Sequence, residues 1–245
     1  MLLEKIKLQT KDNITLEGNL YNSGKSKVII IAHGFYQNKD TRSFKKIAKL
    51  LSPYYDVISM DFRGHGKSKG LFTFTAKETQ DLICFLNFAK NKYQKIGVIG
   101  FSLGAAISII SASKTDLINS LIAVSPPENF WKINYHIWKK EAMQNLLYNL
   151  SPKGNGKGIR PGNVFLKKSK PIDCISSLNE TPVFFIHGKK DWLIHPNHSK
   201  NLFKKAKGTK KIKIIDDATH AEMIYEEYPE EFKNYILSWF DETLN

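Results

Sequence analysis

Cysteine is scarce in this sequence, and long apolar stretches do not occur in it. Only Cys84 and Cys174 are present among 245 residues, which argues against a disulfide framework and against a cysteine-rich metal site. No run approaches the ~18 consecutive apolar residues of a membrane-spanning helix. Residues 1–10 alternate apolar and charged side chains, as a strand does, and lack the apolar core of a secretory signal. We therefore expect a cytoplasmic protein without stable membrane insertion.

Acidic residues are also few: 23 Asp and Glu stand against 37 Lys and Arg, a formal net charge of +14. Such a surplus can indicate a nucleic-acid or anionic-membrane partner. The lysines are scattered over most expected helices and loops, however, and no nucleic-acid-binding motif accompanies them. We therefore expect a solvated basic surface and no nucleic-acid partner. A hydrophobic content of 42% and an aromatic content of 12% indicate a globular chain.

Short apolar runs alternate with helix-compatible segments along most of the chain. Runs typical of strands lie at 3–8, 14–21, 28–32, 57–60, 96–99, 121–124, 183–186 and 211–215. Segments with helical spacing lie at 43–51, 76–90, 105–113, 198–206 and 229–240. This order predicts a single α/β domain over residues 1–245, with a mostly parallel eight-stranded sheet and helices on both faces. In such sheets, chemistry collects beyond the carboxyl ends of the strands.

One stretch combines a strand, a sharp turn and a helix. The apolar residues 96–99 are followed at once by G-F-S-L-G at 100–104 and then by a small-residue, helix-compatible segment. This succession is the context in which G-x-S-x-G forms a nucleophile elbow. Gly100 and Gly104 remove the side chains that would clash where strand and helix nearly touch. The pattern predicts that Ser102 stands at the exposed tip of the turn as a nucleophile.

A serine nucleophile needs a base, and the base needs an acid that fixes its tautomer. His220 follows the last expected strand by five residues, and Asp191 lies one β–α loop earlier. Nucleophile, acid and base in this chain order is a known triad arrangement. Glu128 is a second candidate acid, whereas Asp216 and Asp217 end the strand before His220, a poor place from which to reach its Nδ1. We therefore predict Asp191 as the acid, with Glu128 as the alternative.

The tetrahedral intermediate of acyl transfer also needs N–H donors aimed at its oxyanion. Leu103, directly after the nucleophile, supplies one backbone N–H. The loop after the strand at 28–32 contains Gly34, which lets the chain turn tightly enough for the N–H of Phe35 to face the site. We predict an oxyanion hole formed by the N–H groups of Phe35 and Leu103, with the Phe35 ring lining the acyl pocket.

Four other polar residues at strand ends have structural interpretations. His33 and His65 are expected to pack or form hydrogen bonds within the loops beside the nucleophile. Arg63 and Asp61, two residues apart, are expected to form an internal ion pair that braces their loop. None of the four is assigned a part in the chemistry.

A metal centre is disfavoured. His187 and His195 could be combined with Asp191 as ligands, but no ligand spacing recurs in the sequence. We therefore predict neither a metal nor another cofactor.

Five motifs occur in a characteristic order: H-G-F at 33–35, D-F-R-G-H-G-K-S at 61–68, G-F-S-L-G at 100–104, H-G-K-K-D at 187–191, and His220. Together they resemble the α/β-hydrolase superfamily, most closely the branch of cinnamoyl/feruloyl esterase-like, monoacylglycerol lipase-like and serine aminopeptidase-like serine hydrolases. The resemblance implies an α/β-hydrolase fold and assigns the roles of nucleophile, acid and base to Ser102, Asp191 and His220. It also implies Phe35 and Leu103 as oxyanion donors. Ser102 argues against the dehalogenase and epoxide hydrolase branches, in which the nucleophile is an aspartate.

Residues 128–178 interrupt the strand–helix alternation, and the resemblance does not cover them. We expect a small cap insertion over the site. Phe130, Trp131 and Trp138 are expected to line an acyl or aromatic pocket, with packing against the main domain or a dimer partner as an equally weighted alternative.

The function predicted from these observations is that of a serine carboxylic-ester hydrolase acting on small to medium acyl or aromatic esters. A peptidase, thioesterase or acyltransferase with the same triad is an alternative. An aminopeptidase-like enzyme would need an acidic patch for the substrate amine, and Glu128 and Glu141 are the only acids from 127 to 172. An alternative of another class is a non-catalytic, ligand-binding protein with the same fold. Homodimerisation is left open.

Overall fold

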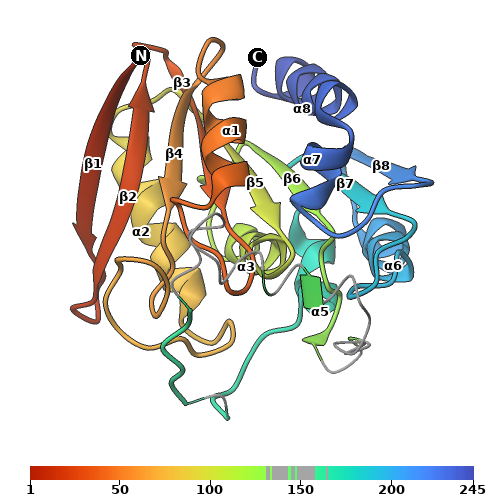
Figure 1. The fold of residues 1–245 in the computed structure, drawn as a ribbon, viewed down its shortest axis with the longest axis horizontal. Coiled ribbons are helices and arrows are strands. Elements are labelled where there is room, and N and C mark those ends of the chain that lie inside the picture. The colour runs from red at the N-terminus through yellow and green to blue at the C-terminus, as the bar shows by residue number, and fades with distance from the viewer. Residues whose placement is uncertain (131–132, 134–142, 145–146, 148–157, 164) are drawn as a thin grey trace.

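The computed structural model describes residues 1–130, 133, 143–144, 147, 158–163 and 165–245. Its strands are β1 (Leu2–Gln9), β2 (Thr15–Asn22), β3 (Lys27–Ala32), β4 (Asp56–Met60), β5 (Lys95–Phe101), β6 (Ser120–Val124), β7 (Val183–Gly188) and β8 (Lys210–Ile215). Its helices are α1 (Arg42–Leu51), α2 (Glu78–Lys90), α3 (Leu103–Ala112), α5 (Pro171–Cys174), α6 (Asn197–Lys205), α7 (Met223–Glu227) and α8 (Pro229–Thr243), with a 3₁₀ turn η2 (Ile175–Ser177). Figure 1 shows these elements as one sheet covered by helices on both sides.

The strands form one sheet in the order β1-β2-β4-β3-β5-β6-β7-β8. The edge strand β1 pairs antiparallel with β2, and β2 pairs antiparallel with β4. All pairings from β4 across to β8 are parallel. The predicted fold class is confirmed, and each of the eight expected strands lies within two residues of its predicted bounds.

Two apolar cores lie on the two faces of the sheet. The central strands are mostly apolar and are buried along almost their whole length, because both of their faces are covered. On one face, Leu82 and Phe85 of α2 pack with residues of α3 and α6. On the other face, Phe44 of α1 packs with Phe232 and Trp239 of α8. Each such side chain, when fully buried, contributes about 1.5–3 kcal/mol to stability, so the sheet is fixed from both sides.

The short helices are the elements that the sequence does not predict. α7 has five residues and α5 has four, which is too few for an apolar repeat of 3.6 to become visible. The longer helices all lie in segments predicted to be helical. In α1, whose apolar spacing carried the prediction, Phe44, Ile47, Ala48 and Leu51 lie on the buried face.

The described parts of segment 128–178 contact the main domain in two places. Residues 158–163 run beside the loop that follows β4: the Arg160 carbonyl accepts a hydrogen bond from Phe72 N at 2.8 Å, and the Arg160 N–H donates one to Gly64 O at 2.9 Å. The chain then returns to α5, where Ile172 N donates to Glu128 O at 3.1 Å. The expected helix over 130–150 lies mostly outside the described residues, and the cap as a whole stays a prediction.

Within the described part of the chain, no helix combines the length and apolarity needed to cross a bilayer.

Candidate active site

Ser102 occupies a strained turn between the central strand β5 and α3. Its backbone has φ 51° and ψ −111°, a conformation that residues with a Cβ adopt rarely and at a cost. A Cβ on Gly104 would lie 2.1 Å from Ala32 O, and a Cβ on Gly100 would lie 2.6 Å from Gly104 O. Both glycines are therefore required by the close approach of strand and helix, as predicted. Only 8% of Ser102 is exposed, less than predicted, because the surrounding loops close over the turn.

Asp191 and His220 are joined by a direct hydrogen bond. His220 Nδ1 lies 2.7 Å from Asp191 Oδ2, and Asp191 Oδ1 accepts the N–H groups of Leu193 at 2.9 Å and Ile194 at 2.8 Å. A carboxylate at Nδ1 keeps the proton on that nitrogen and leaves Nε2 as the basic one. In the described part of the chain, neither His220 Nε2 nor Ser102 Oγ is engaged in another hydrogen bond, nor do they bond to each other. Such catalytic hydrogen bonds often tighten only when substrate binds.

The electrostatics of this pair favour an ionised carboxylate and a basic imidazole. Burial would raise the pKa of Asp191, but the charges and hydrogen bonds of His220 and His187 hold it well below its usual range. Burial would lower the pKa of His220, but the charge and hydrogen bond of Asp191 raise it above its ordinary value. His220 is thereby prepared to accept a proton from a neighbouring hydroxyl.

His187 is a second histidine on the carboxylate of Asp191, a contact that the sequence did not predict. Its Nε2 lies 2.7 Å from Ile194 O and 3.2 Å from Asp191 Oδ2, and its Nδ1 lies 2.7 Å from Ser199 Oγ. His195, the other histidine considered for a metal, instead accepts the N–H of Asn197 at its Nδ1. The residues that the structure describes contain no group of three or more His, Cys, Asp or Glu that could hold a metal ion.

The rival acids have other partners. Glu128 Oε1 lies 4.0 Å from His198 Nδ1. Asp216 pairs with Lys189 at 2.8 Å, and Asp217 pairs with Lys190 at 2.6 Å, both at the surface. Of the candidate acids, Asp191 is the one whose hydrogen bond to His220 is seen among the described residues.

The backbone N–H groups of Phe35 and Leu103, the predicted oxyanion donors, have no acceptor among the described residues. Leu103 is the first residue of α3, and the first N–H groups of a helix have no intrahelical partner. In the loop after β3, the N–H of Gly34 is already engaged by Gln37 Oε1 at 2.9 Å. This leaves the next N–H, that of Phe35, for an oxyanion, and the assignment of both donors stays a prediction.

His33 and His65 are structural residues. His33 Nε2 accepts the N–H of Phe62 at 3.1 Å and its Nδ1 lies 2.7 Å from Gly34 O. His65 Nδ1 lies 3.1 Å from Arg63 O. Burial lowers the pKa of His33 to about 4 and that of His65 to about 3, so both are neutral near pH 7 and serve the packing of their loops.

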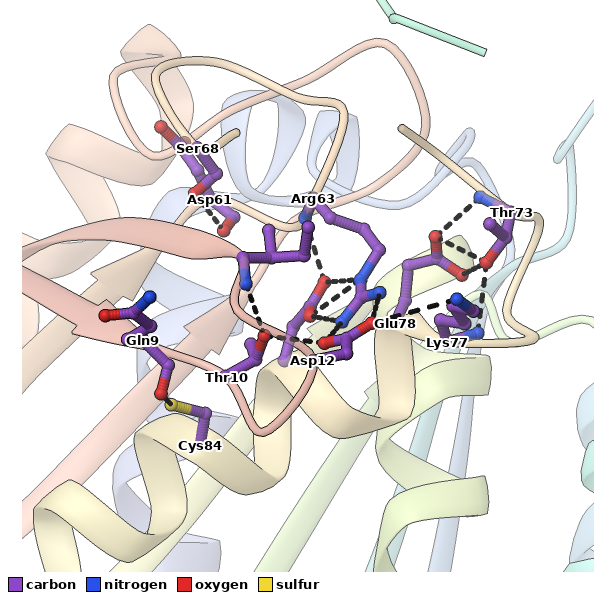
Figure 2. Close-up of polar contacts among 12 residues, drawn as sticks. Gln9, Thr10, Asp12, Asp61, Arg63, Ser68, Thr73, Lys77, Glu78 and Cys84 are labelled. Carbon is purple, nitrogen blue, oxygen red and sulfur yellow. Dashed lines mark hydrogen bonds and ion pairs between the residues drawn. The ribbon is translucent and has the colours of Figure 1, made fainter. Parts of the chain in front are cut away.

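The expected Arg63–Asp61 ion pair is wrong. Arg63 Nη2 instead lies 2.7 Å from Asp81 on α2. Its Nη1 lies 2.7 Å from Asp12 of the β1–β2 hairpin, a contact drawn in Figure 2. Asp61 binds Lys39, whose Nζ lies 2.9 Å from Oδ2. The correct partners come from distant parts of the sequence, which proximity along the chain could not reveal.

Three aromatic rings form a row from the oxyanion loop toward segment 128–178. The Phe35 and Phe74 ring centroids are 5.6 Å apart, and Phe74 and Phe130 are 5.9 Å apart. Phe74 has a φ of 58°, and its loop is held by Glu78, whose carboxylate accepts the N–H groups of Thr73 and Thr75 at 2.7 Å each. Figure 2 shows the contact between Glu78 and Thr73. Phe74 was missed in the sequence because nothing in the pattern distinguishes it from a core residue.

Of the other predicted pocket residues, Trp131 and Trp138 lie outside the described residues. A different tryptophan, Trp192, has its ring centroid 5.9 Å from that of His220. It directly follows the predicted acid, and that adjacency was the signal available in the sequence.

Backbone strain is concentrated around this site. Four non-glycine residues with positive φ lie in the loops after β3, β5, β6 and β8: Tyr36 (61°), Ser102 (51°), Ser125 (47°) and Ala221 (50°). Ser125 Oγ accepts the N–H of Ala221 at 3.1 Å, which ties the loop after β6 to the loop that carries His220. Such clusters of strained residues are typical of functional sites.

The fold and the site define a hydrolase of the α/β class. The alpha/beta hydrolase fold family matches residues 27–156, more than half of the chain. The chain therefore belongs to that family, as the sequence motifs predicted.

Its relatives include proteins of unknown role and a solved esterase. The uncharacterized protein YqkD of Bacillus subtilis is 27% identical over 220 residues, which cover 87% of this chain and 70% of YqkD. The uncharacterized protein YfhR of Escherichia coli K12 is 23% identical over 254 residues, which cover 99% of this chain and 82% of YfhR. The structure of the Pyrococcus furiosus esterase Pf2001 matches with a TM-score of 0.80 and 26% identity, over 100% of this chain and 92% of the esterase.

Proposed function

We propose that this protein is a serine hydrolase that cleaves carboxylic esters through Ser102, His220 and Asp191. The observation that carries the proposal is the Asp191–His220 hydrogen bond of 2.7 Å. The strained Ser102 at the tip of the central strand donates its N–H to Val124 O, and the next residue, Ser125, accepts the N–H of Ala221, which follows His220. Likeness to the Pf2001 esterase over the whole chain supports ester hydrolysis ahead of amide hydrolysis.

In this mechanism, Ser102 Oγ attacks the ester carbonyl while His220 Nε2 takes its proton. Asp191 stabilises the imidazolium that forms. The oxyanion accepts hydrogen bonds from the N–H groups of Phe35 and Leu103, each typically worth about 2.7–4 kcal/mol of transition-state stabilisation. His220 then protonates the leaving alcohol, and a water molecule hydrolyses the acyl-enzyme by the same steps.

The aromatic row of Phe35, Phe74 and Phe130 supports an apolar acyl or aromatic group on the substrate. Rings at centroid distances of 5.6 and 5.9 Å form a continuous apolar surface beside the predicted oxyanion donors. We therefore infer small to medium acyl esters or aromatic esters as the substrate class.

The test is hydrolysis of p-nitrophenyl esters from acetate to palmitate, together with a cinnamate-type ester, by the native protein and by Ser102→Ala. We expect turnover that disappears in the variant, with a preference for short, medium or aromatic acyl groups. Fluorophosphonate labelling of Ser102 provides a second readout that needs no substrate. Labelling without turnover of any ester would contradict the proposal in favour of amide or thioester substrates, and absence of both would favour a non-catalytic binding protein.

A further inference from the structure

His187, near the end of β7, is fully buried, and each of its ring nitrogens faces an oxygen atom. Its Nδ1 lies 2.7 Å from Oγ of Ser199 on α6, a residue that is also fully buried. Its Nε2 lies 2.7 Å from Ile194 O and 3.2 Å from Asp191 Oδ2. The mechanism above uses Asp191 but gives no part to His187, although the two side chains are in contact.

The partners of the His187 ring decide which of its nitrogens carries the proton. Ile194 O is a carbonyl oxygen, and Asp191 is ionised because its partners outweigh burial and hold its pKa well below the usual range. Both groups therefore accept hydrogen bonds and cannot donate them, so Nε2 carries a hydrogen. In the neutral ring, Nδ1 then accepts the hydroxyl of Ser199. The hydrogen bonds thus run in one direction, from Ser199 through His187 to Asp191.

The loop that carries Asp191 is closed around this ring. Asp191 Oδ1 accepts the N–H groups of Leu193 at 2.9 Å and Ile194 at 2.8 Å, while the carbonyl of Ile194 accepts the His187 hydrogen. His187 is therefore tied to the carboxylate twice, once directly and once through Ile194. Because His187 belongs to β7, which is paired with β6 on one side and with β8 on the other, these bonds tie a loop residue to a rigid part of the sheet.

The two histidines share one oxygen of the carboxylate. Asp191 Oδ2 lies 2.7 Å from His220 Nδ1 and 3.2 Å from His187 Nε2. An ionised carboxylate has about two acceptor sites on each oxygen, so His187 occupies one site of Oδ2 and leaves the other for His220. The carboxylate can turn only by breaking its bonds to Leu193, Ile194 and His187. Its orientation toward His220 is therefore fixed before any substrate binds.

We propose that His187 is a positioning residue that holds the Asp191 carboxylate in the orientation that meets His220, and that Ser199 orients His187 from α6. This inference rests on the proposed serine-hydrolase function. It extends the residues on which the rate depends from the loops at the sheet edge to a helix beside the sheet, through one continuous line of hydrogen bonds.

The first test compares two substitutions of His187 that each keep one half of its contacts. The amide of His187→Gln can reach the place of Nε2 and donate there, whereas His187→Asn ends near the place of Nδ1 and can meet only Ser199. We expect kcat for the best p-nitrophenyl ester to fall by about 10–100-fold in His187→Asn, because a misplacement of ~1 Å can cost a factor of about 100. In His187→Gln we expect kcat within about fivefold of the native value, and in both variants KM within about threefold, because Asp191 acts on the imidazolium that forms in the transition state.

The second test asks whether Ser199 acts through His187. Ser199→Ala removes the hydroxyl that faces Nδ1, and we expect a smaller loss of kcat, about two- to fivefold, as for one neutral hydrogen bond. In the His187→Gln background no ring nitrogen faces Ser199. Adding Ser199→Ala there should therefore change kcat by less than about 1.5-fold, since residues that act through one contact are not additive.

The matched control is His195→Asn, the same substitution in the exposed histidine that follows Ile194. Its Nδ1 accepts the N–H of Asn197 at 3.2 Å, so kcat and KM should stay native. The free energy of unfolding in urea is measured for every variant and separates rate from stability. A merely structural His187 would lower this free energy in its variants and leave the kcat of the folded protein native.

Three results would overturn the proposal: native kcat in folded His187→Asn, equal losses in His187→Asn and His187→Gln, or a loss from Ser199→Ala that persists in the His187→Gln background. Should His187→Asn fail to fold, the Ser199→Ala cycle still decides the matter, because native kcat in Ser199→Ala would contradict the proposal.

The rate of fluorophosphonate labelling of Ser102 is measured in parallel for every variant. If the native protein labels but hydrolyses no ester, the ester assignment fails, while the ratios of labelling rates among the same variants still test the positioning role. A native protein that neither labels nor hydrolyses any ester would overturn both proposals.

Discussion

Two buried polar clusters lie at the same edge of the sheet, and they differ in their basic side chain: one contains an arginine and the other a histidine. After β4, the Arg63 guanidinium is enclosed by Asp81 and Asp12, with its Nε, Nη1 and Nη2 all engaged. After β7 and β8, His220 is bound to Asp191 through Nδ1 only. The guanidinium nitrogens of Arg63 therefore all donate to carboxylates, whereas Nε2 of His220 has no partner in the described residues.

This difference distinguishes a structural role for Arg63 from the proposed acid–base role of His220. Burial would lower the pKa of Arg63, but the hydrogen bonds and charges of Asp12 and Asp81 raise it beyond its ordinary value, so Arg63 holds its proton permanently. Against the effect of burial, the charge of Asp191 raises the pKa of His220, and an imidazole, unlike a guanidinium, can take up and release a proton in catalysis. A buried ion pair with a permanent cation fixes loops, and one with an imidazole can also carry out acid–base catalysis.

The largest expected effect comes from removing the charge of the acid that holds His220. Asp191→Asn keeps the size of the side chain but no longer fixes the His220 tautomer, so we expect kcat for the best ester to fall by roughly 10⁴-fold. The measurement is steady-state hydrolysis, with unfolding followed in parallel. An activity loss of less than tenfold would show that another group performs this role.

The bracing cluster should respond in stability. Arg63→Met leaves Asp81 buried without its cation, and breaking such a pair costs about 3–5 kcal/mol in the free energy of unfolding. Replacing both partners, as Arg63→Met with Asp81→Leu, should restore much of this loss because no buried charge is stranded. Urea unfolding of the single and the double variant measures the stability lost and the stability recovered. A single variant within about 1 kcal/mol of the native protein would contradict the bracing role.

A change of pH should affect the activity that depends on His220 and the stability that depends on it in opposite directions. His220 must be neutral to accept a proton, and its pKa is raised, so kcat/KM should begin to fall as pH decreases at values above the ordinary ~6.5 of histidine. The sign is opposite for stability: a histidine with a raised pKa in the folded state stabilises it most at low pH, and this contribution is lost as pH rises through the folded pKa. A profile of kcat/KM against pH tests the first expectation, and the free energy of unfolding at pH 6 and pH 9 tests the second. In Asp191→Asn we expect the difference in unfolding free energy between the two pH values to become smaller.

The smallest effect belongs to an exposed ion pair near the same loops. Asp217 pairs with Lys190 at 2.6 Å, but both side chains are more than 60% exposed, and such pairs contribute little. Asp217→Asn should therefore leave turnover and the unfolding temperature unchanged within error. A large loss of activity would mean that this carboxylate, and not Asp191, supports His220.

The sequence predicts the strands of the sheet and the principal residues of the site, because both depend on local signals. Buried parallel strands are continuous apolar runs, and the turn around Ser102 requires glycines at fixed positions. Asp191 and His220 could be predicted because each follows a recognisable strand, and the carboxyl ends of parallel strands meet at one edge.

Contacts between side chains from distant segments could not be predicted in this way. The partner of Arg63 was expected at Asp61, two residues away, yet it is Asp81 on α2 that faces the guanidinium. Phe74 reaches the aromatic row only because its loop adopts a positive φ, which the sequence does not indicate for a phenylalanine.

The strained turn at Ser102 also bears on how this protein could be engineered. Its φ of 51° is one that glycine adopts freely and serine does not, and the same holds for Ala221 at 50°. A laboratory selection for heat resistance alone would therefore favour glycine at these two turns, one of which carries the proposed nucleophile. Thermostable variants of this chain should be sought in helices and surface loops, with these turns held constant, because glycine at Ser102 would gain stability by removing the proposed nucleophile.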